Sequence, residues 1–136
     1  MTEENDSLAW AHVVAEAALA RKGLHIVVLD VSALTSFADA FVIATGTSDR
    51  HTRSVADGVV ECAKQHGNAP LGVEGYEDGE WVLIDLNDVI VHVFQGEARS
   101  HYDLERLWAD APSTTYDEDG ARDRDAGERG VECSAP

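Results

Sequence analysis

Residues 81–94, with the sequence WVLIDLNDVIVHVF, restrict the fold more than any other segment of the chain. Two runs of alternating apolar residues flank Asn87 and Asp88, a pair typical of a two-residue hairpin turn. In the register that this turn sets, residue 86 pairs with 89, 84 with 91 and 82 with 93. One face of the hairpin is then wholly aliphatic, which predicts that it belongs to the core. The six side chains on that face are Val82, Ile84, Leu86, Val89, Val91 and Val93.

The opposite face of the hairpin mixes large apolar groups with a carboxylate and an imidazole. Because successive side chains of a strand point to opposite sides, it carries Trp81, Leu83, Asp85, Ile90, His92 and Phe94. Aromatic anchors among polar groups are typical of a surface that recognises another protein. A helix from either end of the chain could instead cover this face, with His92 bonded to a neighbour. The sequence leaves both interpretations open.

The rest of the chain shows strand and helix patterns in alternating order, which indicates an α/β layout. Further strands are expected at 25–31, 40–45 and, as an extended piece, 72–76. Helices are expected from Asp6 or Ser7 to about Lys22, from 47–49 to about His66, and over 97–109, where Leu104 and Leu107 would face the sheet. We therefore predict one small α/β domain with a mixed sheet of about five strands and flanking helices.

Composition limits the classes of partner. The 136 residues are 44% hydrophobic, enough to bury a core, and their 26 acidic and 10 basic side chains give a net charge of −16. Phosphate backbones repel such a surface, so we expect no direct, sequence-specific binding of nucleic acid. The N-terminal segment MTEENDS is unlike a signal peptide, and no run of about 18 apolar residues is present. These features predict a soluble cytoplasmic protein that has no membrane partner.

The composition changes after Pro112. The segment beyond it holds seven acidic and three basic residues and few large apolar ones. Such a segment cannot bury enough apolar surface to offset the entropy of an ordered chain. We predict that 113–136 is a disordered acidic tail and that 1–112 is the folded domain, which itself carries −12 of the net charge.

The chain contains one candidate catalytic junction but no complete catalytic site. Its six histidines and two cysteines show no metal-ligand spacing, so we expect no metal and no cofactor. The turn Gly46-Thr47-Ser48 lies between a strand and a helix, where nucleotidyltransferases hold a phosphate. Such enzymes also need a close pair of carboxylates for magnesium, whereas Asp85 and Asp88 lie on either side of the hairpin turn. We interpret the junction as a helix cap and predict no catalytic residue, with a nucleotide-binding enzyme as the alternative.

Four stretches of the sequence, in this order and spacing, resemble the RsfS (Iojap) family of ribosomal silencing factors. The resemblance runs from about residue 8 to residue 112, and no single motif in it is decisive. The stretches are SFAD at 36–39 followed by FVIATGTSDR at 41–50; GVEG at 72–75; WVLID at 81–85; and VHVF at 91–94 leading to YDLERLW at 102–108.

The resemblance implies a nucleotidyltransferase-like fold without the catalytic apparatus, usually present as a homodimer. It also implies a partner, the large-subunit ribosomal protein L-fourteen, at the surface where the small subunit docks. Binding there would block subunit association and repress translation when nutrients are short. An acidic protein would be steered towards basic ribosomal proteins. The residues that the family places at this contact match Trp81, Leu83 and Asp85, with Glu74, Tyr76 and His92 as neighbours.

Overall fold

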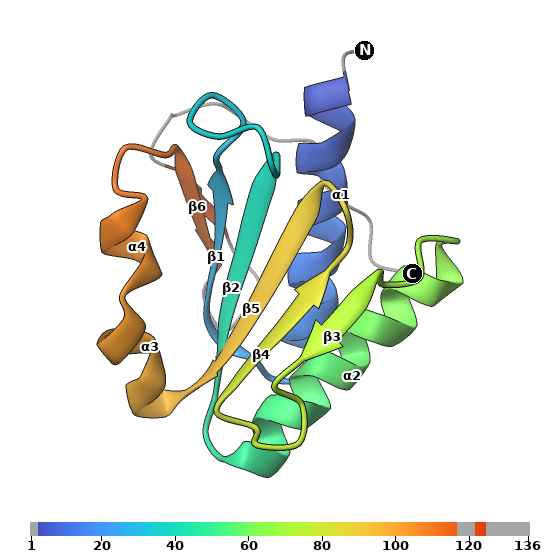
Figure 1. The fold of residues 1–136 in the computed structure, drawn as a ribbon, viewed down its shortest axis with the longest axis vertical. Helices are drawn as coiled ribbons and strands as arrows, with labels where there is room; N and C mark the ends of the chain where they lie inside the picture. Colours follow the sequence, from blue (N-terminus) through green and yellow to red (C-terminus); the bar gives the residue numbers. More distant parts are fainter. Residues whose placement is uncertain (1–2, 117–121, 125–136) are drawn as a thin grey trace.

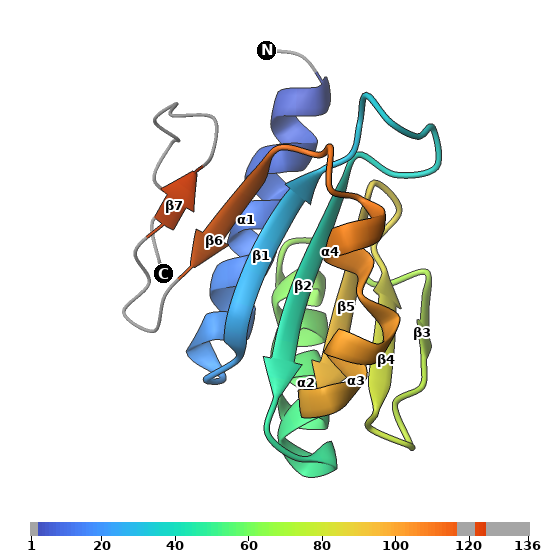
Figure 2. The same ribbon diagram turned by 90° about the vertical axis from the view of Figure 1, so that its left-hand side faces the viewer.

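The computed structural model describes residues 3–116 and 122–124. Within these residues the chain forms one mixed sheet of seven strands in the order β3-β4-β5-β2-β1-β6-β7 (Figure 1; β7 is labelled in Figure 2). The strands are β1 (Leu24–Asp30), β2 (Ala40–Gly46), β3 (Gly72–Glu74), β4 (Trp81–Asp85), β5 (Val89–Gln95), β6 (Ser113–Tyr116) and β7 (Arg122–Arg124). The helices are α1 (Glu3–Ala20), α2 (Asp49–Gln65), α3 (Gly96–Tyr102) and α4 (Leu104–Leu107).

The sheet confirms the predicted α/β class and its mixed strand directions. β2 and β5 are parallel neighbours, whereas all the other neighbouring strands are antiparallel. The chain leaves β2 into α2 on one face of the sheet and leaves β5 into α3 on the other face (Figure 2). Helices therefore lie on both faces, α1 and α2 on one and α3 and α4 on the other.

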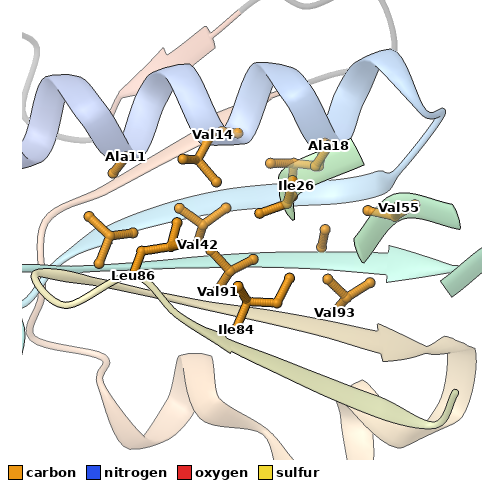
Figure 3. Close-up of a cluster of buried hydrophobic side chains, with 14 of the residues drawn as sticks. Ala11, Val14, Ala18, Ile26, Val42, Val55, Ile84, Leu86, Val91 and Val93 are labelled. Atoms are coloured by element: carbon orange, nitrogen blue, oxygen red, sulfur yellow. The ribbon is translucent and has the colours of Figure 1, made fainter. Parts of the chain in front are cut away.

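The hairpin of β4 and β5 has the predicted register and the predicted core face. Val82 lies opposite Val93, and a 2.9 Å hydrogen bond from the Leu86 amide to the Val89 carbonyl closes the turn. All six aliphatic side chains of this face are buried. They pack with Val14 of α1 and with α2 in the larger of two hydrophobic clusters (Figure 3).

A second, smaller cluster lies on the opposite face of the sheet, under α3 and α4. It joins Phe41 and Ile43 of β2 and Phe94 of β5 to Ala98 of α3, with Trp108 packed against its edge. The central strands β2 and β5 contribute side chains to both clusters. They are thus covered on both faces, which explains why β2 is buried along its whole length.

The N-terminal helix begins earlier than predicted. Because α1 starts at Glu3, neither Asp6 nor Ser7 is its cap. The Ser7 hydroxyl instead donates a hydrogen bond of 2.9 Å to the Asp39 carboxylate. This contact ties α1 to the loop that precedes β2.

The helix predicted over 97–109 is two short helices. Asp103 has φ 52°, a left-handed conformation that interrupts the helical ladder. Leu104 packs against the second cluster as predicted. Leu107 is 73% exposed, so the prediction that it faces the sheet was wrong, because the break at Asp103 rotates the faces of α4.

The predicted domain boundary at Pro112 is also wrong. Residues 113–116 form β6, which pairs with β1 so that Tyr116 lies opposite Ile26. Tyr116 is only 3% exposed and its hydroxyl bonds to Nδ1 of His12 in α1. The segment orders because β1 offers it an open edge and α1 offers its aromatic ring a place in the core. The rest of the predicted tail, 117–121 and 125–136, lies outside the described residues.

Candidate functional site

The face of the hairpin that carries Trp81 is partly covered by a helix and partly open to solvent. On the covered part, next to β2, His92 is 6% exposed and Phe94 is fully buried. α3 packs on β5 and β2, which leaves β4 at the margin of the covered area. Trp81, Leu83 and Asp85 of β4 are therefore only half-buried.

The open part of the hairpin and the adjacent strand β3 together form a surface that we call the open face. Cross-strand pairing places Glu74 of β3 beside Leu83, and Leu83 beside His92. Glu74 is exposed. Asp85 and Ile90 pair at the turn end of the hairpin, and Trp81 occupies the other end. The open face consists of Glu74, Trp81, Leu83, Asp85 and Ile90.

Trp81 is fixed in place although it is half-exposed. Its indole Nε1 donates a hydrogen bond of 3.2 Å to Nδ1 of His92. Its ring stacks on Phe94 with centroids 5.1 Å apart, and Tyr102 of α3 lies 4.4 Å away on the same measure. An aromatic side chain that is ordered before binding loses little rotamer entropy when it binds, which suits an anchor.

His92 is a neutral imidazole beneath the open face. Burial lowers its pKa to about 4, because a charged ring would lose its hydration there. Since Nδ1 accepts the Trp81 hydrogen bond, the proton of the neutral ring is assigned to Nε2. That atom is buried, and within the described residues it has no hydrogen-bond partner.

Local backbone geometry holds β3 against β4. Gly75 follows β3 with φ +79°, and a Cβ built on it would lie 2.0 Å from the carbonyl oxygen of Trp81. Only glycine allows this approach. At the other end of β4, Oδ1 of Asp85 accepts a 2.9 Å hydrogen bond from the amide of Asn87, and no group among the described residues bonds to its second carboxylate oxygen.

Tyr76 does not join the open face. Its hydroxyl donates a 3.0 Å hydrogen bond to Oδ1 of Asp57 in α2, which packs on the other face of the sheet. That hydrogen bond and the negative charge of Asp57 raise the pKa of Tyr76. Of the six residues singled out in the sequence, the structure therefore gathers five, with His92 beneath the others, and places Tyr76 elsewhere.

The open face lies in a strongly acidic part of the chain. Residues 71–95 contain six carboxylates and neither lysine nor arginine. The apolar side chains of Trp81, Leu83 and Ile90 thus sit among negative charges. A surface of this kind suits a basic protein and repels a phosphate backbone.

The junction between β2 and α2 is a helix cap, as predicted. Ser48 is the N-cap residue, and its hydroxyl oxygen accepts a 3.1 Å hydrogen bond from the amide of His51. Asp85 pairs with Ile90 at the start of β5, so it lies at the opposite end of the sheet from this junction. The described residues contain no group of three or more His, Cys, Asp or Glu arranged to hold a metal.

A hollow of about 550 Å³ does lie beside this junction, at the ends of β2 and β5. Its most buried cation is Arg99 of α3, whose guanidinium makes a two-bond contact with the Glu105 carboxylate, at 3.0 and 2.9 Å. The same guanidinium donates to the Thr45 hydroxyl at 2.8 Å and to the carbonyl of His25. Arg99 therefore has a structural role, joining α3 and α4 to the sheet.

Sequence reasoning missed the aromatic residues that frame the open face. Phe41 and Trp108 pack edge to face with centroids 5.2 Å apart, and Tyr102 covers Trp81. Their spacing along the chain gives no local signal, because Phe41 lies in β2, Tyr102 in α3 and Trp108 directly after α4.

Among the described helices, none is both long and apolar enough to cross a lipid bilayer.

Comparison with known proteins gives concordant matches. A family model described as "Ribosomal silencing factor during starvation" (RsfS) matches residues 4–133. The ribosomal silencing factor RsfS of Halalkalibacterium halodurans is 40% identical over 93 residues, which cover 68% of this chain and 80% of that protein. Its counterpart in Chromobacterium violaceum is 45% identical over 87 residues, which cover 64% and 71%. A crystal structure of a Chromobacterium violaceum protein superimposes with a TM-score of 0.70 at 40% identity, covering 80% of this chain and 87% of that one.

Proposed function

Because this chain belongs to the RsfS family of ribosomal silencing factors, we propose that it binds the large ribosomal subunit at protein L-fourteen. Bound there, it keeps the small subunit from joining and so represses translation. The observation that carries this proposal is the open face, where an ordered, half-exposed Trp81 lies among carboxylates. The role of such a factor is regulatory, and the proposal assigns it no catalytic residue.

The chemistry of the open face favours a basic protein over ribosomal RNA as the direct contact. Trp81 and Leu83 offer apolar area that a protein side chain can cover, and burying aromatic groups dominates the energy of many interfaces. Glu74 and Asp85 offer charges that a lysine or arginine can meet. Phosphates would be repelled by the same carboxylates. The direct contacts that we propose are Glu74, Trp81, Leu83 and Asp85, with His92 as their support from beneath.

The proposal is tested by sedimentation with isolated ribosomal subunits. The protein is expected to pellet with large subunits and to remain in the supernatant with small subunits. In a second step, light scattering follows the joining of purified subunits, which the protein should reduce in proportion to the large subunits it occupies. Equal binding to both subunits, or joining at an unchanged rate with the large subunits saturated, would contradict the proposal.

We further propose that the chain acts in the cytoplasm, together with the ribosomes it binds, and that it forms a homodimer. Support for the dimer comes from the family resemblance. Sedimentation equilibrium of the purified protein should give twice the mass of one chain. A single-chain mass at every concentration up to that used for ribosome binding would exclude the dimer and leave the ribosomal role unaffected.

A further inference from the structure

A row of aromatic rings extends the open face beyond the hairpin. From Trp81 it passes to His92 and on to Phe41, whose ring meets the imidazole edge to face at 5.3 Å between centroids. Phe41 then contacts Phe37 at 6.1 Å. Phe37 belongs to the loop 31–39 and also meets Trp108 at 6.2 Å. We call Phe37, Phe41 and Trp108 the aromatic ledge.

Phe37 is the exposed member of this ledge. Its side chain is 62% exposed, whereas Phe41 beneath it is 4% exposed. Leaving a phenylalanine in water forgoes most of the free energy that its burial would contribute. Exposed apolar side chains mark interaction sites when they form a patch, and Phe37 adjoins Trp108, which is itself only half-buried.

The loop that carries Phe37 is held at both ends. The Val31 amide donates to the Asp39 carbonyl at 3.0 Å, and the Asp39 amide donates to the Asp88 carbonyl in the hairpin turn at 2.8 Å. Ser7 of α1 holds the Asp39 side chain. The ledge is therefore fixed relative to the hairpin, and a partner could meet both surfaces without reordering the loop.

The sequence around the ledge is acidic, like that around the open face. Residues 30–40 include Asp30 and Asp39 and neither lysine nor arginine, and Asp88 adjoins the loop. Phe41, on which Phe37 packs, pairs with Ile90 of the open face, so the two surfaces adjoin at the turn end of the hairpin. This adjacency, together with the acidic sequence around both surfaces, indicates a single partner for the two.

We propose that Phe37 is a second anchor for the basic ribosomal protein that binds the open face, and that it receives an aliphatic or aromatic side chain of that protein. The inference rests on the proposed function. It adds a contact outside the hairpin, on a segment that sequence alternation could not connect with Trp81. Two anchors at opposite ends of the surface would fix the orientation of the partner as well as its affinity.

The test compares two exposed apolar residues on different faces of the sheet. Leu71, which is 70% exposed, precedes β3 and is two residues from Val73, which lies opposite the core residue Ile84. Its side chain is thus on the face away from the ledge, which makes Leu71→Ala the matched control. Both residues are exposed, so neither substitution should change the melting temperature by more than a small amount.

Binding of the full-length variants to isolated large subunits is measured at a fixed salt concentration. Phe37→Ala is expected to raise the Kd about tenfold or more, whereas Leu71→Ala leaves it unchanged. Phe37→Lys should bind more weakly than Phe37→Ala, because it also places a cation against a basic partner.

Several outcomes would overturn the inference. If Phe37→Ala and Phe37→Lys bind as the wild type does while Trp81→Ala fails to bind, the ledge is not an anchor, but the proposed function stands. If Phe37→Ala converts a dimer into single chains with unchanged ribosome binding, the ledge contacts a second copy of this chain. If the wild type itself does not bind large subunits, the proposed function fails and the second anchor with it.

Discussion

The indole Nε1 of Trp81 and Nδ1 of His92 lie 3.2 Å apart, in a hydrogen bond between neighbouring strands. The bond couples a half-exposed side chain to a buried one. It gives the buried imidazole an acceptor role that only a neutral ring can take, and it gives the exposed indole a fixed orientation. The recognition chemistry that we propose for Trp81 thus depends on a residue that the partner does not have to touch.

Replacing Trp81 should separate binding from folding. Trp81→Ala removes the proposed anchor and should weaken large-subunit binding by about thirtyfold or more, corresponding to roughly 2 kcal/mol. Because the ring is half-exposed, the free energy of unfolding should fall by less than the roughly 3–5 kcal/mol typical of a fully buried aromatic residue. Urea denaturation of this variant gives the free energy of unfolding, and co-sedimentation with large subunits gives its affinity. Normal binding by Trp81→Ala would remove this residue from the contact.

The His92 ring should make the fold less stable in acid. Burial lowers its folded-state pKa to about 4, from the ordinary histidine value of 6.5, so between these two pH values the unfolded chain binds a proton at this ring and the folded chain does not. The stabilisation is complete above about pH 6.5 and is lost as the pH falls towards 4, at about 1.4 kcal/mol per pH unit.

The substitution His92→Asn isolates this contribution. An asparagine keeps an oxygen near the position of Nδ1 for the Trp81 hydrogen bond but does not titrate. The free energy of unfolding of both proteins is measured by urea denaturation at several pH values between about 7.5 and 4.5. The difference between them should shrink as the pH falls. A difference that stays constant across this range would show that the His92 ring is able to charge in the folded state.

Strand β6 should be required for full stability. Truncation after Pro112 removes Tyr116, whose ring is 3% exposed and whose hydroxyl bonds to His12. Tyr116→Ala alone should cost about 3–5 kcal/mol, and Tyr116→Phe, which loses only the hydroxyl, about 1 kcal/mol. Thermal unfolding of the truncated chain and of the two Tyr116 variants measures these losses of stability. A chain that ends at Pro112 and melts like the full-length protein would show that β6 contributes nothing to the fold.

The hairpin could be predicted in detail because its information is local. The two-residue period of 81–94 and the turn at Asn87 fix which side chains share a face, and the aliphatic set is buried as expected. β6 could not be predicted in this way. Its four residues, Ser-Thr-Thr-Tyr, carry little apolar surface, and they become ordered through contacts with β1 and α1, which are far away in the chain.

The candidate site was likewise predictable only where its residues are close together in the sequence. Alternation identified Trp81, Leu83 and Asp85 as neighbours, since they belong to one strand. It could not show that Tyr76 turns towards α2, because that depends on Asp57. It also could not show that Phe37 lies near the hairpin, since that proximity depends on where the loop before β2 meets the turn.

Magnesium and nucleotide binding test the alternative enzyme hypothesis. The two carboxylates considered as magnesium ligands are Asp85 and Asp88. Both lie at the hairpin turn, at the other end of the sheet from the Ser48 cap. Calorimetric titration with ATP and magnesium should therefore give no heat beyond dilution. Turnover of the nucleotide that disappears in an Asp85 or Asp88 variant would establish the enzyme and refute the cap interpretation.

A substitution at Asp85 can separate the effect of its charge on binding from any effect on the stability of the fold. Its Oδ1 accepts the Asn87 amide at 2.9 Å, and Asp85→Asn keeps an oxygen there, so the turn and the melting temperature should be preserved. If the free oxygen meets a lysine or arginine, the variant should bind large subunits several-fold more weakly at low salt, with a smaller deficit at high salt. The matched control is Asp57→Asn on α2, which removes the same charge from the other face of the sheet. Equal losses in both variants would mean that net charge steers the protein to the ribosome without a contact at Asp85, whereas a loss confined to Asp85→Asn locates the ion pair on the open face.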